Sequence, residues 1–242
     1  MDSIKVNLKN VKMVAHRGLS GIERENTYPA FVAAGNRSYF GIETDIHCTA
    51  DGKFVVIHDE TTERVSNGAI NVNVEEETSE NLKGILLPDL DGKVERRDIC
   101  LPFLSDYINI CKKYEKKCVL ELKNPFTEEA LKKVVAEIKE LDYLENVIFI
   151  SFAFENCSAL RPIAPECEIQ WLTANEITDE EIELLKKYSL ELDINYKKLT
   201  KEVVEKLHSN GIKVNCWTCD SAEDAAALAE MGVDYITSNI LE

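Results

Sequence analysis

Residues 14–59 hold the side chains that are best suited to chemistry: two histidines, an arginine and two carboxylates at the ends of short apolar runs. In chain order they are His16, Arg17, Glu43, Asp45 and His58. Successive residues of a strand point to opposite faces, so Glu43 and Asp45 share one face. Two carboxylates about 4 Å apart repel by ~4 kcal/mol at an effective dielectric constant near 20. A divalent cation would relieve this repulsion, and an oxygen-only ligand set favours Mg²⁺, Ca²⁺ or Mn²⁺.

Five short motifs match the order and spacing of the glycerophosphodiester phosphodiesterase family. They are His16-Arg17-Gly18, Glu25-Asn26-Thr27, Glu43-x-Asp45, Thr49-x-Asp51-Gly52 and His58-Asp59. The chain therefore resembles this family. The resemblance implies a metal-dependent phosphoric diester hydrolase that converts a small glycerophosphodiester into sn-glycerol 3-phosphate and an alcohol. One divalent cation is the implied cofactor, and the implied setting is lipid and glycerol metabolism.

The two histidines suit the proton transfers of such a hydrolysis, which needs a base for the attacking oxygen and an acid for the leaving alkoxide. Imidazole, with a reference pKa near 6.5, can do either at neutral pH. We therefore expect His16 and His58 to be catalytic, and the resemblance favours His16 as the base. Attack by water and attack by the glycerol 2-hydroxyl both stay open. Arg17 has a planar fork that matches phosphate oxygens, with a surface ion pair as the alternative.

A second candidate group is Glu121-Leu122-Lys123, at the end of the apolar run 118–122. In a strand Glu121 and Lys123 point to the same side. By resemblance to the family's Glu-x-Lys pair, Glu121 is expected to be the third metal ligand and Lys123 to neutralise phosphate charge. A surface salt bridge is the alternative interpretation.

Two further features leave alternatives open. Trp217 is either a core residue or, by resemblance to a family Trp-Thr pair, a substrate-binding residue beside the glycerol; Ser151-Phe152 resembles a family pair that lines the pocket. Cys216 and Cys219 lack the second pair that a zinc site would need, so we interpret them as incidental thiols.

Predicted strands and helices alternate along the chain. The strands are expected at 12–15, 41–46, 118–122, 147–151, 168–172, 190–194, 212–217 and 233–236. This alternation predicts a parallel sheet, and eight units predict a TIM (β/α)₈ barrel. We expect one domain over residues 1–242, with an insertion at approximately 46–102 after the second strand and a truncated or missing last helix. A doubly wound open sheet is the alternative, but no Gly-x-Gly-x-x-Gly follows the first strand.

Composition restricts the partners. The net charge of −16 argues against nucleic acid and anionic membranes, because both attract a basic face. No apolar run has the length of a signal-peptide core or a bilayer span. The eight cysteines are scattered without a disulfide rhythm, which favours free thiols in a reducing cytoplasm. We therefore expect a cytoplasmic enzyme without stable membrane insertion; its oligomeric state is not predicted.

Two rival functions and two departures from the family remain. The rivals are a lysophospholipase D-like enzyme of the same fold and a catalytically silent phosphate- or glycerol-binding module. Arg24 stands where the family usually has proline, and Thr237-Ser238-Asn239 stands where it has Thr-Asp followed by proline. His47 and His208 are expected at the surface.

Overall fold

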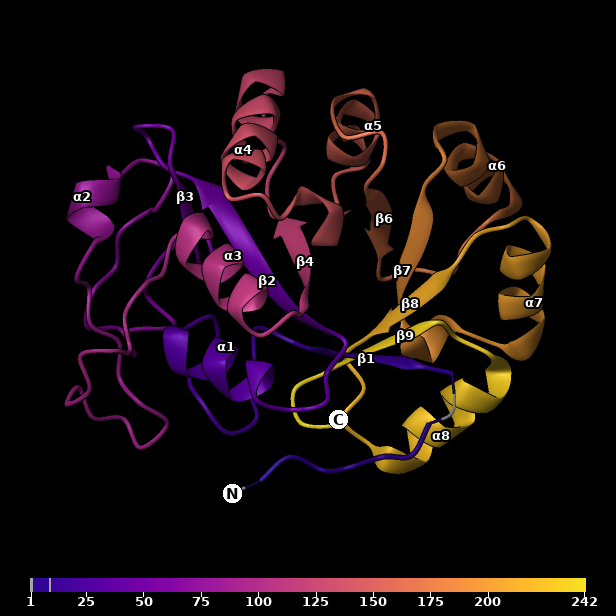
Figure 1. The fold of residues 1–242 in the computed structure, drawn as a ribbon, viewed down its shortest axis with the longest axis horizontal. Coiled ribbons are helices and arrows are strands. Elements are labelled where there is room, and N and C mark those ends of the chain that lie inside the picture. Colours follow the sequence, from indigo (N-terminus) through magenta and orange to yellow (C-terminus); the bar gives the residue numbers. More distant parts are fainter. Residues whose placement is uncertain (1, 9) are drawn as a thin grey trace.

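The computed structural model describes residues 2–8 and 10–242 and contains a closed barrel of eight parallel strands (Figure 1). The barrel strands are β1 (Lys12–Ala15), β2 (Gly41–Cys48), β4 (Lys117–Leu122), β5 (Val147–Ser151), β6 (Glu168–Thr173), β7 (Glu191–Asn195), β8 (Val214–Trp217) and β9 (Tyr235–Ser238). β1 pairs in parallel with both β2 and β9, which closes the barrel. The predicted TIM barrel is confirmed, and the open sheet is excluded.

Helices follow seven of the eight strands and surround the barrel (Figure 1). They are α1 (Tyr28–Gly35), α3 (Leu104–Lys113), α4 (Glu128–Glu140), α5 (Phe154–Ile163), α6 (Asp179–Tyr188), α7 (Lys201–Ser209) and α8 (Ala222–Met231), with short 3₁₀ turns at Leu144–Asn146 and Tyr196–Lys198. Thr127, Thr178, Thr200 and Ser221 each accept a backbone N–H of the first helical turn, as N-cap side chains do. The local sequence therefore determines where these helices begin.

Among the described residues no helix follows β9. The chain after β9 instead pairs with the N-terminal segment: the Ile4 N–H donates to the Ile240 carbonyl at 2.9 Å, and the Val6 N–H donates to the Glu242 carbonyl at 2.7 Å. The barrel therefore closes without a final helix, and the last residues are held by backbone hydrogen bonds.

Each barrel strand separates two apolar regions. Residues that face the helices, among them Ile42, Leu120 and Phe149, belong to the large core between sheet and helices. The barrel interior holds a smaller cluster: Val14, Val119, Ile148, Ile150, Leu172 and Tyr235. This alternation follows from the two-residue period of a strand, and it also turns Glu43, Asp45 and Glu121 into the barrel.

The segment between β2 and α3 lies to one side of the barrel and contains β3 (Phe54–Val56) and α2 (Ser79–Leu82) (Figure 1). β3 runs antiparallel to the end of β2, so the two strands form a hairpin that extends beyond the barrel. The segment has its own apolar cluster: Val55, Ile57, Val65, Val74, Leu82, Leu87, Ile99 and Leu101. Burial of this cluster explains how an irregular segment holds a defined shape. The single-domain boundaries and the insertion limits stay a prediction.

Candidate active site

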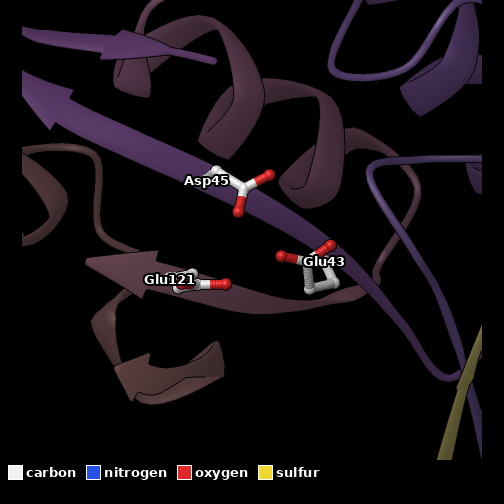
Figure 2. A group of neighbouring side chains, drawn as sticks. All are labelled: Glu43, Asp45 and Glu121. Atoms are coloured by element: carbon white, nitrogen blue, oxygen red, sulfur yellow. The ribbon is translucent and has the colours of Figure 1, made fainter. Parts of the chain in front are cut away.

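Three acidic side chains meet inside the barrel. Glu43 and Asp45 project from β2, Glu121 projects from the neighbouring strand β4, and Asp45 and Glu121 are partners in the strand register. The carboxylates point toward one another (Figure 2), with one oxygen of each within 4.8 Å of the others. They are only 3%, 1% and 7% exposed. The structure thus brings the three predicted metal ligands together.

The charges of this cluster are incompletely balanced. Lys123 Nζ lies 2.8 Å from a Glu121 oxygen and 3.4 Å from an Asp45 oxygen. Burial, and then the charges of Asp45 and Glu121, raises the pKa of Glu43 well above its ordinary value. Burial and the charge of Asp45 likewise raise the pKa of Glu121 to about 7. The pKa of Asp45 is lowered, because the charges of Lys123 and Arg17 outweigh the effect of its burial.

These residues fit a hard divalent cation. The donor set consists of oxygen atoms only, as Mg²⁺, Ca²⁺ and Mn²⁺ prefer. Raised pKa values at Glu43 and Glu121 mark negative charge that Lys123 and Arg17 do not neutralise. Among the described residues this is the one group of three or more His, Cys, Asp or Glu side chains close enough to share an ion. The cluster could therefore hold a divalent metal.

Arg17 joins the cluster through backbone and side chain. Its φ is +54°, and Gly18 follows with φ +75°; a Cβ at Gly18 would lie 2.7 Å from Ala30 atoms. This turn directs the Arg17 backbone N–H to Glu43 Oε2 at 2.8 Å. Its Nη1 donates to Glu25 at 2.9 Å, and its Nε lies 3.5 Å from Asp45. Arg17 is therefore largely buried beside the acids, with 17% of its side chain exposed, and does not form a surface ion pair.

His16 follows β1 directly, and a network of hydrogen bonds orients its ring. His16 Nδ1 lies 2.7 Å from Asn239 Oδ1. The Asn239 amide is itself fixed, since its Nδ2 and backbone N–H both donate to Asp220, at 2.6 and 2.7 Å. An amide oxygen can only accept, so the proton of neutral His16 is on Nδ1 and Nε2 is left with a free lone pair. Burial, and then the charge of Arg17, lowers the pKa of His16 to about 4.

His58 has a different partner. Its Nδ1 lies 2.6 Å from Asp59 Oδ1, and Arg64 donates to both oxygens of Asp59. Arg64 also donates to both oxygens of Glu25, the residue that binds Arg17. Burial lowers the pKa of His58, against the charge of Asp45, which raises it. Arg64 thus connects Asp59, the partner of His58, with Glu25, the partner of Arg17.

His47 was expected at the surface, and that expectation is wrong. Its ring is 2% exposed, with Nδ1 2.8 Å from Glu75 Oε1 and Nε2 3.1 Å from the backbone carbonyl of His58. β2 continues past Asp45 and carries His47 beneath the loop that holds His58. His208 lies at the surface of α7, as expected, beside Asp234.

A cavity of about 110 Å³ opens onto these groups. Its lining residues are His16, Arg17, Glu43, His58, Glu121, Ile150, Phe152, Leu172, Asp193, Trp217, Thr218 and Thr237. Trp217 and Phe152 stand edge to face, 5.6 Å between ring centres, as one wall. Ser151 does not line the cavity; its hydroxyl donates to the Leu122 carbonyl. A larger hollow between the β2–β3 turn and α4 contains none of the predicted site residues.

Several residues at the site were not singled out from the sequence. Asn26 donates to Asp45 Oδ2 at 2.8 Å and could have been noticed, because it lies inside a quoted motif. Asp220 and Asp193 lie far from the motifs and have no local signal, and Asn239 was noted only as a departure from the family sequence. Asp193 on β7 is 1% exposed and faces the same cavity.

The structure also bears on the expected free thiols and on the expected absence of a membrane-spanning segment. All eight cysteines, Cys216 and Cys219 among them, are free thiols. In the part of the chain that the structure describes, every helix is too short or too polar to cross a membrane.

A parallel eight-stranded barrel with carboxylates and histidines at the carboxyl ends of its strands defines a TIM-barrel enzyme. The model of the glycerophosphoryl diester phosphodiesterase family matches residues 16–241. A glycerophosphodiester phosphodiesterase of Caldanaerobacter subterraneus subsp. tengcongensis is 30% identical over 236 residues, which cover 94% of this chain and 93% of the relative. The chain therefore belongs to the glycerophosphoryl diester phosphodiesterase family and is a phosphodiesterase.

Solved structures agree with this fold. The crystal structure of a glycerophosphodiester phosphodiesterase from Parabacteroides distasonis is 27% identical, with a TM-score of 0.78, and covers 96% of this chain and 94% of that one. An Oleispira antarctica phosphodiesterase in complex with the product sn-glycerol-3-phosphate is 23% identical, with a TM-score of 0.81, and the coverage is 95% and 93%.

Proposed function

We propose that the enzyme hydrolyses glycerophosphodiesters to sn-glycerol 3-phosphate and an alcohol, with one divalent cation held by Glu43, Asp45 and Glu121. The observation that carries this proposal is the convergence of three buried carboxylates, two of which, Glu43 and Glu121, line the same cavity as His16 and His58. The product-bound Oleispira antarctica phosphodiesterase supports the assignment of the product. The oxygen ligands suit Mg²⁺ or Ca²⁺, with Mn²⁺ as a further candidate.

The cation, when bound, supplies a Lewis acid that offsets the negative charge that develops on the phosphoryl oxygens. Arg17 and Lys123 contribute positive charge from the protein, because both already lie against the acidic cluster. Removal of one such electrostatic contact commonly costs about 2.7–4 kcal/mol of transition-state stabilisation. Trp217 forms a wall of the cavity and would bind the glycerol part of the substrate there.

The partners of the two histidines support separate roles. His16 has a neutral amide on Nδ1 and a pKa lowered to about 4, so Nε2 is unprotonated at neutral pH and can accept the proton of the attacking oxygen. His58 has the Asp59 carboxylate on Nδ1, which stabilises the imidazolium form and acts against the burial that lowers the pKa of His58. His58 would therefore donate the proton to the leaving alkoxide. The same assignment serves attack by water and attack by the glycerol 2-hydroxyl.

The setting proposed for this reaction is the cytoplasm. The eight free cysteines suit a reducing compartment. A net charge of −16 makes a small-molecule substrate, drawn in by the positive charge that Arg17, Lys123 and a bound cation would supply together, more suitable than a nucleic acid.

Release of sn-glycerol 3-phosphate from glycerophosphocholine tests the proposal. We expect EDTA to abolish release and Mg²⁺, Ca²⁺ or Mn²⁺ to restore it. His16→Ala and His58→Ala should each abolish turnover, whereas the surface variant His208→Ala should retain it. Activity that survives EDTA would contradict the cation site, and full activity in either of the first two variants would contradict the role of that histidine.

A further inference from the structure

Asp193 is a buried carboxyl group in the candidate active site that the proposed reaction does not use. It lies in the middle of β7, is 1% exposed and lines the cavity together with His16, His58 and Glu121. Its neighbours in the strand, Leu192 and Ile194, belong to the core beneath the helices. The two-residue period of the strand therefore turns Asp193 into the barrel.

Asp193 Oδ1 is fully enclosed and has no hydrogen-bond partner in the described part of the protein. A buried carboxyl group without a hydrogen-bond partner destabilises the folded protein. A protein therefore retains such a group where a ligand or another bound molecule supplies the missing hydrogen bond. Burial, and then the charge of Glu121, raises the pKa of Asp193 well above its ordinary value. The neutral carboxyl group offers both a donor and an acceptor.

A second orphaned polar atom faces the same cavity. The indole Nε1 of Trp217 is buried and has no partner among the described residues. Trp217 is the register partner of Asn195, two residues beyond Asp193, so Asp193 lies one inward-facing position deeper in the barrel. On the other side of Asp193 the cavity wall is apolar, formed by Leu172 on β6 and Ile150 on β5. The cavity thus presents an isolated donor–acceptor pair and an isolated donor on an apolar wall.

We propose that Asp193 binds a free hydroxyl group of the glycerol part of the substrate and selects for substrates that carry it. A hydroxyl group donates one hydrogen and accepts others, so it can satisfy a neutral carboxyl group, which also donates and accepts. A ligand without the hydroxyl leaves this buried group unpaired, which is the strongest basis for discrimination between similar ligands. This inference rests on the proposed function, because that function identifies the ligand as a glycerol phosphate ester.

Binding of two phosphate monoesters tests the proposal without any turnover. We would measure, by calorimetry with Mg²⁺ present, the affinity for sn-glycerol 3-phosphate and for propyl phosphate, which has the same carbon chain and no hydroxyl. The wild-type protein should prefer glycerol 3-phosphate by about tenfold to a hundredfold. Equal affinities, or no binding of either ester, would overturn the proposal.

Variants assign the preference to Asp193. In Asp193→Val the preference should fall to about threefold or less, through weaker binding of glycerol 3-phosphate and unchanged binding of propyl phosphate. Asp193→Asn retains a donor and an acceptor and should keep most of the preference. A preference that survives in Asp193→Val would overturn the proposal. An equal loss for both esters would also overturn it, since this would indicate a phosphate or cation ligand.

Melting temperatures separate this role from a structural one. Ligand-free Asp193→Val should melt at or above the wild-type temperature, because an unpaired buried carboxyl is removed. The matched control is Asn215→Val on the adjacent strand, where the amide is buried and hydrogen-bonded to Gln170. This control should melt lower and keep the ligand preference. A lower melting temperature for Asp193→Val with the preference intact would show a structural role.

If the valine variant does not fold, the affinities of the wild-type protein and of Asp193→Asn for the two esters still decide. A hydrolysis assay that fails would contradict the proposed function and leave these affinities as an independent result.

Discussion

His16 Nδ1 and Asn239 Oδ1 lie 2.7 Å apart, although 223 residues separate them in the chain. β1 and β9 are paired neighbours in the closed barrel, so the residue that follows one strand meets the residues that follow the other. Asp220, after β8, holds the amide in place. The orientation and tautomer of the proposed base are thus determined by two residues near the end of the chain.

Loss of this contact should impair catalysis more than binding. In Asn239→Ala, His16 loses the acceptor that keeps its proton on Nδ1, and we expect kcat to fall by about 10- to 100-fold with little change in KM. Ring ¹⁵N shifts of His16 should show a mixture of tautomers in the variant and one tautomer in the wild type. Ser20→Ala is the control, because Ser20 also bonds Asn239 but does not touch the His16 ring. An unchanged kcat in Asn239→Ala would contradict the positioning role.

The acidic cluster should make stability depend on a divalent cation. A cation at about 100 times its dissociation constant should add ~2.7 kcal/mol to the free energy of unfolding of the wild-type protein. Glu43→Gln should lose this increment, and without the cation it should be no less stable than wild type because the repulsion by Asp45 and Glu121 is gone. Thermal melts with and without Mg²⁺ measure both. An equal cation-induced increase in Glu43→Gln would argue against this site.

The burial of neutral His16 should appear in the pH dependence of the metal-free protein. Its pKa is about 4 in the folded protein against 6.5 for an unperturbed histidine, so the unfolded chain binds more protons between these values. The stabilisation from neutral His16 is complete above pH 6.5 and is lost as the pH falls toward 4. The wild type should lose up to about 3 kcal/mol more than His16→Gln over this range. Urea titrations in EDTA from pH 7 to 4 test this, and parallel curves for the two proteins would refute it.

Arg64 should matter for turnover more than its partial exposure suggests. Arg64→Gln releases Asp59, the partner of His58, and Glu25, the partner of Arg17, so we expect kcat to fall by about tenfold. Its loss of stability should be about 1 kcal/mol or less, since the side chain is 45% exposed. Arg96→Gln is the matched control: Arg96 also pairs with several acids, Glu23 and Asp89 among them, but away from the cavity. Equal kcat in the two variants would contradict the coupling to His58.

Much of the fold follows from the sequence because its signals are local. The alternation of predicted strands with helices located all eight barrel strands within a few residues. The prediction for His47 was wrong because its burial is not a local property. Glu75 and the loop that holds His58 cover this residue, and both are distant from it in the local sequence pattern.

The sequence by itself determined the chemical types at the site: two histidines, three carboxylates, an arginine and a lysine at or just beyond strand ends, with the two-residue period that turns Glu43 and Asp45 to one side. The tertiary structure alone decided how these groups are held. Closure of the barrel brings Asn239 to His16, and the register of β2 and β4 brings Glu121 to Asp45. The packing around the inner face of β7 leaves Asp193 Oδ1 without a partner among the residues that the structure describes. The strand period and the helix caps depend on residues a few positions apart, so the sequence reveals them. Contacts across a closed barrel join residues that are far apart in the chain, so only the tertiary structure reveals them.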